Sequence, residues 1–423
     1  MSKLAINGGP KAVQLDAGDI FTWPIITKED EDAVLEVLRA RKMSATDVTQ
    51  QFEAEYAQWH GSKFALGHNT GTAALHAAMF GCGVGVGDEI ICQSMTYWAS
   101  ALPAFSLGAT VVFAEIDPDT LTLDPGDIEH RITERTKAIM VVHYCGYPTD
   151  MDPIMQIAEK HGIKVIEDVS HAHGGLYKGK LVGTIGHVGA MSLMSGKSLA
   201  CGEGGILITD DRKIYESAVA FGHYGRTAPT LTIPELKRFS GLPQGGYKYR
   251  MHQISSAVAR VQLRHYKERL EEIQAAMNYF WDLLEGVPGI KAHRPPLGSN
   301  STMGGWYAAH GIYVPEELDG LDIRKFCSAV SAEGAGIGAG ANMLLHLHPL
   351  LNEADIYGHG KPTRIANSDR DVRQPLGSLP VTESVPKRIY SIPWFKHYRP
   401  RIIEGYALAF RKVAENADEI RGD

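Results

Sequence analysis

Three short segments of the chain carry residue types that can act together on a small molecule. They are residues 68–75, 165–174 and 192–205. The first can offer free backbone N–H groups, the second contains carboxylates and histidines, and the third holds a lysine among small residues. An anion site, an acid and a primary amine are groups from which covalent catalysis is built.

The first segment predicts either a helix cap or an anion site. A polar loop leads directly into an alanine-rich stretch, with Gly71 and Thr72 at the junction. Free N–H groups and the positive end of the helix dipole favour an anion there. Gly71 allows close approach, and Thr72 adds a hydroxyl. The simpler alternative is an ordinary N-cap made by Thr70 or Thr72, because caps are more common than anion sites.

The second segment places a carboxylate where a buried strand is expected to end. An apolar run stops at Glu167 and Asp168, and His171 and His173 follow. Ligands of parallel sheets bind at the carboxyl ends of the strands, so Asp168 is expected to face a ligand. A turn cap or a zinc site is the alternative. No third convincing ligand group is present, which argues against the metal.

The third segment indicates a reactive amine. Lys197 lies in a loop of small residues between two apolar strands. Partial desolvation there would lower the pKa of the lysine and make it a nucleophile. A nucleotide phosphate loop is excluded, because the first glycine of that motif would fall on Met191. For any single lysine the alternative is a solvated surface charge.

Together the three segments match what pyridoxal phosphate requires. A lysine forms the Schiff base, an acid keeps the pyridine nitrogen protonated, and an anion site holds the phosphate. A fourth segment, residues 94–100, contains Tyr97 and Trp98 and follows another apolar run. An aromatic ring there can stack on the pyridine ring, with core packing as the alternative.

An α/β sheet is expected to hold these segments in place. Short apolar runs without clean alternation indicate strands buried on both faces. The expected strands are residues 89–92, 110–114, 138–142, 164–167 and 206–209. The expected helices include residues 28–41, 72–79 and 153–161, the last with Asp152 as its N-cap. This alternation predicts a mostly parallel sheet with helices on both faces.

The rest of the chain suggests a second, smaller unit. A helical period of apolar residues runs through residues 251–284 and predicts a helix that bridges two domains. A final helix is expected over residues 400–420. We therefore expect an N-terminal arm (1–27), a large α/β domain with the bridging helix (28–285) and a small C-terminal α+β domain (286–423).

Composition limits the class of protein. Of the 423 residues, 44% are hydrophobic and 22% are charged, as in an ordinary globular protein. The formal net charge of −7 argues against a nucleic-acid partner. The sequence contains no uninterrupted run of about 18 apolar residues, so we expect no membrane span. The opening residues lack the apolar core of a signal peptide. Five scattered cysteines indicate reduced thiols, hence a cytoplasmic protein.

On these motifs the chain resembles the DegT/DnrJ/EryC1/StrS family of fold-type I pyridoxal-phosphate enzymes. The resemblance runs from residues 5–9 to residues 406–413. Its most specific motif is the lysine followed by Gly-Glu-Gly-Gly at residues 202–205. The acid motif and the Thr-Gly-Thr loop agree with the family in order and spacing. The resemblance implies a homodimer with shared active sites.

The resemblance also implies a role for each matching residue. Lys197 would be the Schiff-base lysine and proton shuttle, and Asp168 would pair with the pyridine nitrogen. His171 would lie against the cofactor ring or its 3-hydroxyl, and Tyr97 would stack on the ring. The phosphate would be bound by Gly71, Thr72 and Ser192.

One position departs from the family pattern. The family usually donates an asparagine from the neighbouring subunit to the phosphate, and Lys248 occupies that place. A lysine can still bind phosphate as a point charge. The alternative is a surface lysine beside the bridging helix.

The implied reaction is a ping-pong transamination. Glutamate or glutamine would donate the amino group, and the acceptor would be a ketone of a sugar or cyclitol, either scyllo-inosose-like or nucleotide-linked. The length of the chain, its Asn-Gly-Gly start and its C-terminal half favour the branch that includes glutamine-dependent scyllo-inosose aminotransferases. Dehydration or elimination on the same cofactor is an alternative, as is a non-catalytic binding protein. A few family members work as dehydratases with histidine in place of the lysine, so Lys197 favours transamination.

Overall fold

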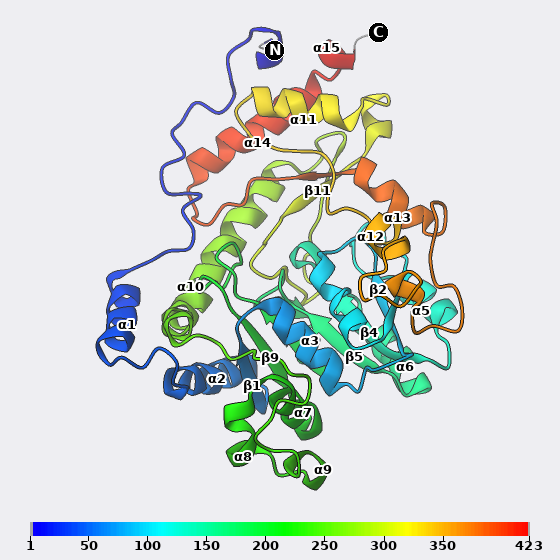
Figure 1. The fold of residues 1–423 in the computed structure, drawn as a ribbon. Helices are drawn as coiled ribbons and strands as arrows, with labels where there is room; N and C mark the ends of the chain where they lie inside the picture. The colour runs from blue at the N-terminus through cyan, green and yellow to red at the C-terminus, as the bar shows by residue number, and fades with distance from the viewer. Residues whose placement is uncertain (1–2, 422–423) are drawn as a thin grey trace.

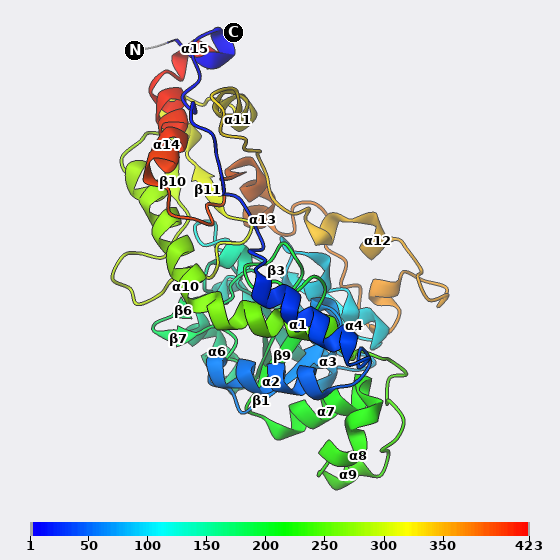
Figure 2. The same ribbon diagram turned by 90° about the vertical axis from the view of Figure 1, so that its left-hand side faces the viewer.

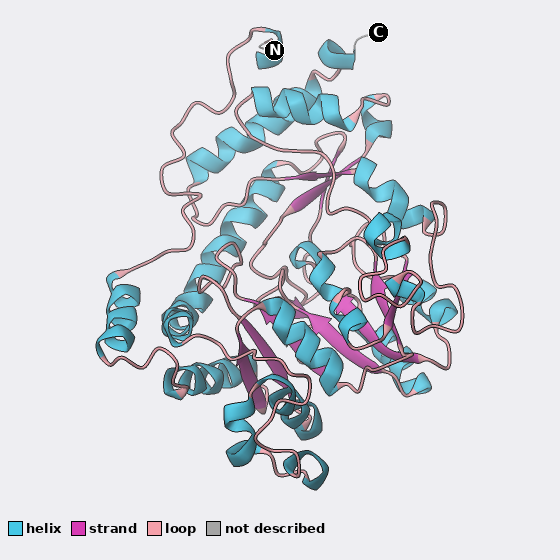
Figure 3. Cartoon of the chain, in the orientation of Figure 1, coloured by secondary structure: helices cyan, strands magenta, loops and turns pink. Residues whose placement is uncertain are grey.

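The computed structural model describes residues 3–421, which are organised around a seven-stranded sheet (Figure 1, Figure 3). The strand order is β1-β9-β8-β5-β4-β2-β3. The strands are β1 (Phe64–His68), β2 (Glu89–Gln93), β3 (Thr110–Ala114), β4 (Thr136–Val142), β5 (Lys164–Asp168), β8 (Val188–Ser192) and β9 (Gly205–Thr209). Within this sheet only β9 runs antiparallel to its neighbours. The expected mostly parallel sheet is confirmed.

Successive strand residues face two different hydrophobic cores. On β2, Ile90 and Cys92 belong to one core and Ile91 to the other. Because both faces are buried, the strands read as continuous apolar runs. One face is covered by α3 (Gly71–Gly81) and α7 (Arg212–Gly222), and the other by α2 (Asp47–His60), α6 (Met151–His161) and the first half of α10 (Gln253–Leu283).

The N-cap expected for residues 153–161 is wrong. Helix α6 begins at Met151, and Asp150 takes the N-cap position with an extended backbone. Asp152 lies in the first turn instead, where its charge suits the positive end of the helix dipole. Aspartate fits both positions, so the local sequence did not distinguish them.

Strand β8 is absent from the expected strands, and so is β1. Its five residues include a glycine and a histidine and no β-branched residue, so they carry little strand propensity. The strand exists because it pairs along its whole length with β9, from Phe64 opposite Thr209 to His68 opposite Gly205. A partner distant in sequence therefore decides its conformation.

A smaller unit is built on a three-stranded antiparallel sheet. Its strands are β10 (Ile290–Ala292), β11 (His310–Tyr313) and β12 (Ile389–Ser391). They share a third core with α11 (Ile323–Ala332), α14 (Pro400–Glu415) and the second half of α10. The segment that precedes α1 (Lys28–Arg39) runs past this unit (Figure 2). Its residues Leu4 and Ile20 are buried in the same core.

The C-terminal region also packs on the edge of the large sheet. The Gln374 side chain accepts a hydrogen bond from the Phe113 N–H (2.9 Å) and donates one to the Phe113 carbonyl (2.8 Å). Leu379 and Val385 join the core of that sheet. The division at residue 286 stays a prediction, because segments on both sides of it contribute to one core.

The other elements are short. They are α4 (Pro103–Ser106), α5 (Pro125–Arg131), β6 (Leu176–Tyr177), β7 (Lys180–Leu181), α8 (Thr227–Thr230), α9 (Pro234–Lys237), α12 (Pro349–Asn352), α13 (Pro380–Ser384) and α15 (Asp418–Arg421). The expected final helix is thus interrupted after α14, because Asn416 leaves the helical conformation (φ −125°, ψ 31°). Within residues 3–421, no helix has the length and apolar character needed to cross a membrane.

Candidate active site

Seven of the eight predicted site residues line one cavity of about 440 Å³. They are Gly71, Thr72, Tyr97, Asp168, His171, Ser192 and Lys197. The cavity lies where β5 and β8 end and α3 begins. This is the edge at which parallel sheets bind their ligands. Lys248 does not line the cavity in this chain.

The start of α3 is both capped and open to an anion. The Thr70 hydroxyl accepts a hydrogen bond from the Ala73 N–H (3.0 Å), so Thr70 is the N-cap. Within residues 3–421, the N–H groups of Gly71 and Thr72 have no acceptor. Gly71 and Thr72 line the cavity together with Ser192. The cap and the anion site, expected as alternatives, are compatible here.

Gly71→Ala is expected to damage both the fold and the anion corner. A Cβ at position 71 would lie 2.5 Å from the Ser192 Cβ and 2.6 Å from its Cα, so α3 and β8 must separate. We expect a loss of about 1–3 kcal/mol in the free energy of unfolding. Cofactor affinity should also fall, because the two N–H groups move. Urea unfolding and cofactor titration of the apo protein measure the two effects.

Gly405→Ala provides the matched control for this substitution. A Cβ at position 405, within α14, would lie 4.0 Å from its nearest neighbour, the Ala12 carbonyl oxygen. Alanine there should stabilise the helix by about 0.5–1 kcal/mol and leave cofactor binding unchanged. Equal behaviour of the two variants would contradict the tight packing at Gly71.

Asp168 ends β5 with its carboxylate held by two donors. The Ser100 hydroxyl donates to Oδ2 (2.7 Å), and the Ser170 N–H donates to Oδ1 (3.0 Å). Asp168 is 4% exposed, and its backbone lies between Val142 on β4 and Ala190 on β8. The bond to Ser170 is the expected turn cap. The side chain also lines the cavity, so it can hold a cationic group there.

The two histidines that follow Asp168 are buried and neutral. Burial lowers the pKa of His171 well below its ordinary value and that of His173 to about 3. The Cys145 N–H donates to His171 Nδ1 (3.3 Å), which places the ring proton on Nε2. His173 Nε2 donates to the Ser192 carbonyl (2.8 Å). In the described part of the chain, no three potential metal ligands cluster closely enough to hold an ion.

Lys197 is a buried amine rather than a surface charge. It is 7% exposed. Burial lowers the pKa of Lys197 to about 8, and the nearby Asp168 carboxylate and Cys145 thiol oppose that shift. About a tenth of the amine is therefore neutral at pH 7, far more than for an ordinary lysine, and the neutral form is the one that nucleophilic attack requires. The backbone is held as well, because the Trp23 indole N–H donates to the Lys197 carbonyl (2.8 Å).

Tyr97 lies at the mouth of the cavity. Its side chain is 49% exposed, and the neighbouring Trp98 ring lies 5.0 Å away between centroids. Neither ring is core packing in this chain, which removes the simpler alternative. Tyr97 lines the cavity, whereas Trp98 does not.

Sequence reasoning did not single out several cavity residues. Ser100 and Ser170 orient the Asp168 carboxylate, and Tyr307 and Asn342 form part of the far wall. Asn342 accepts a hydrogen bond from the Tyr144 hydroxyl (2.6 Å). The Gly-Gly pair that precedes Tyr307 by two residues was a usable signal, since such pairs mark close approach of backbones.

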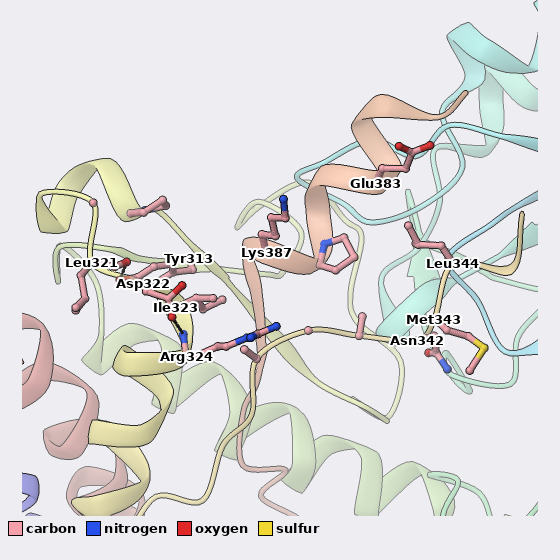
Figure 4. Close-up of a pocket in the computed structure, with 16 residues that line it drawn as sticks. Tyr313, Leu321, Asp322, Ile323, Arg324, Asn342, Met343, Leu344, Glu383 and Lys387 are labelled. Carbon is pink, nitrogen blue, oxygen red and sulfur yellow. Dashed lines mark hydrogen bonds between the residues drawn. The ribbon is translucent and has the colours of Figure 1, made fainter. Parts of the chain in front are cut away.

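A larger cavity of about 730 Å³ adjoins the first (Figure 4). It lies between the start of α11 and the α13 region, and Arg324, Lys387 and Glu383 are among its lining residues. Asn342 lines both cavities. The larger cavity contains none of the predicted site residues. The candidate active site is therefore the smaller of the two cavities.

The residues of the smaller cavity fit pyridoxal phosphate. Unpaired N–H groups at a helix start suit a phosphate, and the missing Cβ at Gly71 lets the start of α3 pack directly against Ser192, another residue of the cavity. The buried Asp168 carboxylate suits a protonated ring nitrogen, and the Lys197 amine suits covalent attachment. All three groups line one cavity.

Comparison with known proteins agrees with this geometry. Residues 24–401 match the DegT/DnrJ/EryC1/StrS aminotransferase family. The chain is 34% identical over 344 residues to L-glutamine:2-deoxy-scyllo-inosose aminotransferase of Streptomyces kanamyceticus, covering 78% of this chain and 79% of that protein. It is 31% identical over 396 residues to dTDP-3-amino-3,4,6-trideoxy-alpha-D-glucose transaminase of Streptomyces venezuelae, covering 92% and 93%.

Comparison of the fold with solved structures also finds an aminotransferase. The X-ray structure of the aminotransferase from Psychrobacter cryohalolentis superposes with a TM-score of 0.81 at 26% identity, over 95% of this chain and 100% of that chain. Fold, motifs and family match thus agree. The chain belongs to the DegT/DnrJ/EryC1/StrS aminotransferase family, and its cofactor is pyridoxal 5′-phosphate.

Proposed function

We propose that this aminotransferase moves an amino group from glutamate or glutamine to a ketone of a sugar or cyclitol. The observation that carries the proposal is the placement of the Lys197 amine and the Asp168 carboxylate in one cavity beside the open start of α3. The two relatives are named for a cyclitol ketone and for a nucleotide-linked amino sugar. Both names support an acceptor of the sugar or cyclitol class.

Each residue of the smaller cavity would have a different role in the reaction. Pyridoxal phosphate, when bound, supplies an aldehyde that condenses with amines and a ring that accepts electrons. Lys197 Nζ would hold the cofactor and, once released, would be the group that moves a proton to and from the substrate. Asp168 would keep the ring nitrogen protonated. The Gly71 and Thr72 N–H groups and the Ser192 hydroxyl would hold the phosphate.

Two further side chains orient the ring. His171 presents its Nε2–H as a donor, because the Cys145 N–H occupies Nδ1. That donor can meet the 3-hydroxyl oxygen of the cofactor or pack against its ring. Tyr97, at the cavity mouth, can stack on the ring. The amino group would stay on the cofactor while the first product leaves and before the acceptor binds, so we expect ping-pong kinetics.

A donor and acceptor screen tests the proposal. Holoenzyme should lose its aldehyde absorbance with glutamate or glutamine, and the spectrum should return when a keto sugar or keto-cyclitol is added. Product mass should show a new amine. No spectral change with either donor would contradict the proposal. A product that has lost water without gaining nitrogen would instead establish the dehydratase alternative.

Lys248→Ala is expected to weaken cofactor affinity if Lys248 is donated to the phosphate of a partner subunit. Within its own chain, Lys248 Nζ lies 6.0 Å from the Tyr224 ring centroid and away from the cavity. We expect turnover at saturating cofactor to suffer less, because the phosphate is remote from the reacting atoms. The effect should shrink at high salt, as for a partly exposed charge.

Mixed dimers decide whether the contact is made in trans. The mixture is assayed at subsaturating cofactor, where Lys248→Ala is expected to have low activity. If the contact is made in trans, combining Lys248→Ala subunits with Lys197→Ala subunits gives one complete site, with Lys197 from one chain and Lys248 from the other. Activity above the sum of the two variants measured separately supports a homodimer with shared sites. Lys237→Ala, which removes an exposed lysine from α9, is the control and should change nothing. Unchanged affinity in Lys248→Ala would make Lys248 a surface charge.

A further inference from the structure

The Lys197 amine lies against the face of an aromatic ring. Lys197 Nζ is 3.8 Å from the centroid of the Tyr307 ring, well inside the range of a cation–π contact. Tyr307 is half-buried and lines the same cavity. Asp168 acts on the amine through its charge alone, without a hydrogen bond between the two groups. The ring is therefore a close neighbour of the amine.

The segment that carries Tyr307 is pressed against the two loops of the active site. A Cβ at Gly304 would lie 2.4 Å from the Ala172 backbone, and one at Gly305 would lie 2.0 Å from the Ser198 Cβ. The Gly304 N–H also donates to the Gly146 carbonyl (2.9 Å). Only glycine permits this approach, so the position of the segment depends on the loops that hold His171 and Lys197.

The segment is also fixed from its other side. Trp306 (φ 58°) and Ala308 (φ 54°) both adopt the left-handed conformation, which costs a non-glycine residue free energy. The buried Trp306 indole donates to the Gln274 side chain on α10 (3.0 Å), and Gln274 donates back to the Gly304 carbonyl (3.0 Å). Strain maintained by such contacts sets the direction of Tyr307, which lies between the two left-handed residues.

The backbone of Lys197 is held by a different aromatic residue. Trp23, from the segment before α1, donates its indole N–H to the Lys197 carbonyl (2.8 Å). Trp23 and Tyr307 both pack on Trp394, with centroids 5.8 Å and 6.0 Å away. One aromatic group thus holds the main chain of the lysine, and another faces its amine.

We propose that Tyr307 is a positioning residue whose ring face holds the Lys197 ammonium in the cavity whenever the amine is not covalently attached. This inference rests on the proposed role of Lys197. A lysine side chain has four rotatable bonds, and the released amine must return to the same reacting carbon in each half-reaction. Contact with a fixed ring limits the number of conformations that the lysine side chain can adopt. It also favours the charged form of the amine between proton transfers.

The groups that face the amine define the expected titration. They are Asp168, Cys145, His171 and Tyr307, and the exposed Glu203 lines the same cavity without acting on the amine. Burial lowers the pKa of Lys197, whereas Asp168 and the Tyr307 ring favour its protonated form. His171 is neutral and does not change this balance. Removal of the Tyr307 ring therefore takes away one of the groups that oppose the effect of burial on the pKa of Lys197. The pKa of the amine should then fall further.

Tyr307→Leu and Tyr307→Phe separate the ring from its hydroxyl. In the apo protein, the reaction of Lys197 with acetic anhydride across pH 6–10, read by peptide mass spectrometry, reports the pKa of the amine. We expect Tyr307→Phe to match the wild type and Tyr307→Leu to lower that pKa by about one unit. An unchanged pKa in Tyr307→Leu would overturn the proposal. Tyr307→Met provides the same reading if the leucine variant is not folded.

Kinetics of the holoenzyme give an independent measurement. In Tyr307→Leu the rate of the donor half-reaction should fall about tenfold with the KM for the donor changed less than twofold, because the ring acts on the lysine and not on the donor. Tyr307→Phe should retain the wild-type rate. A rise in KM alone would make Tyr307 a substrate contact and contradict the proposal. A wild-type enzyme without donor activity would instead refute the proposed function, while the titration of the apo protein would still test Tyr307.

Discussion

Lys197→Ala is expected to abolish turnover. The cavity contains no second amine, since Lys197 is the only lysine among its lining residues in the described part of the chain. Loss of a covalent catalytic group lowers rates by at least about a thousandfold. The fold should persist, because the removed amine takes part in no hydrogen bond that the structure shows. Cofactor can still bind through its phosphate and Asp168, so absorbance titration should show binding without turnover.

Borohydride trapping checks the identity of this lysine directly. Reduction of wild-type holoenzyme should fix the cofactor on the peptide that contains Lys197, and the variant should show no adduct. Lys180 and Lys248 are the internal controls, since both remain available in the variant. An adduct on either of them in the wild-type protein would contradict the assignment.

Asp168→Asn is expected to preserve the fold and strongly impair catalysis. The amide oxygen can still accept one of the two hydrogen bonds that now come from Ser100 and Ser170. It cannot stabilise a positively charged ring nitrogen. Loss of a charge-assisted hydrogen bond costs about 1.5–3 kcal/mol, which corresponds to at least about tenfold in rate. The half-reaction with the amino donor, followed by absorbance, measures the effect.

Asp150→Asn is the matched control. Its carboxylate also accepts a hydroxyl hydrogen bond, from Tyr177, and it lies at the start of α6 rather than at the cavity. Any general cost of replacing a hydroxyl-bonded aspartate by asparagine should appear in both variants, although Asp150 is exposed and Asp168 is buried, and the loss of rate should appear only in Asp168→Asn. Activity of Asp168→Asn within twofold of the wild type would remove this residue from the mechanism.

The local sequence was sufficient for the mostly parallel sheet and for most of the predicted residues that line the smaller cavity. Five of the seven strands and helices α1, α3, α6, α10 and α14 were predicted, because continuous apolar runs and helical periods depend only on neighbouring residues, whereas α2, α7 and α11 were not. The Thr-Gly-Thr loop, Asp168 and Lys197 were identified because each lies where a strand meets a helix or a loop. The topology of a parallel sheet then requires such junctions to meet at one edge.

Strand β1, the burial of Lys197 and the place of Tyr307 were decided by tertiary structure. Residues 64–68 have little strand propensity and adopt their conformation through β9. Lys197 becomes a buried amine only because segments far away in the sequence close over it, including Trp23, 174 positions away. Such contacts depend on how distant segments pack. Residue types and their spacing therefore determined which chemistry this chain can perform, whereas packing between distant segments decided the environment of each reacting group.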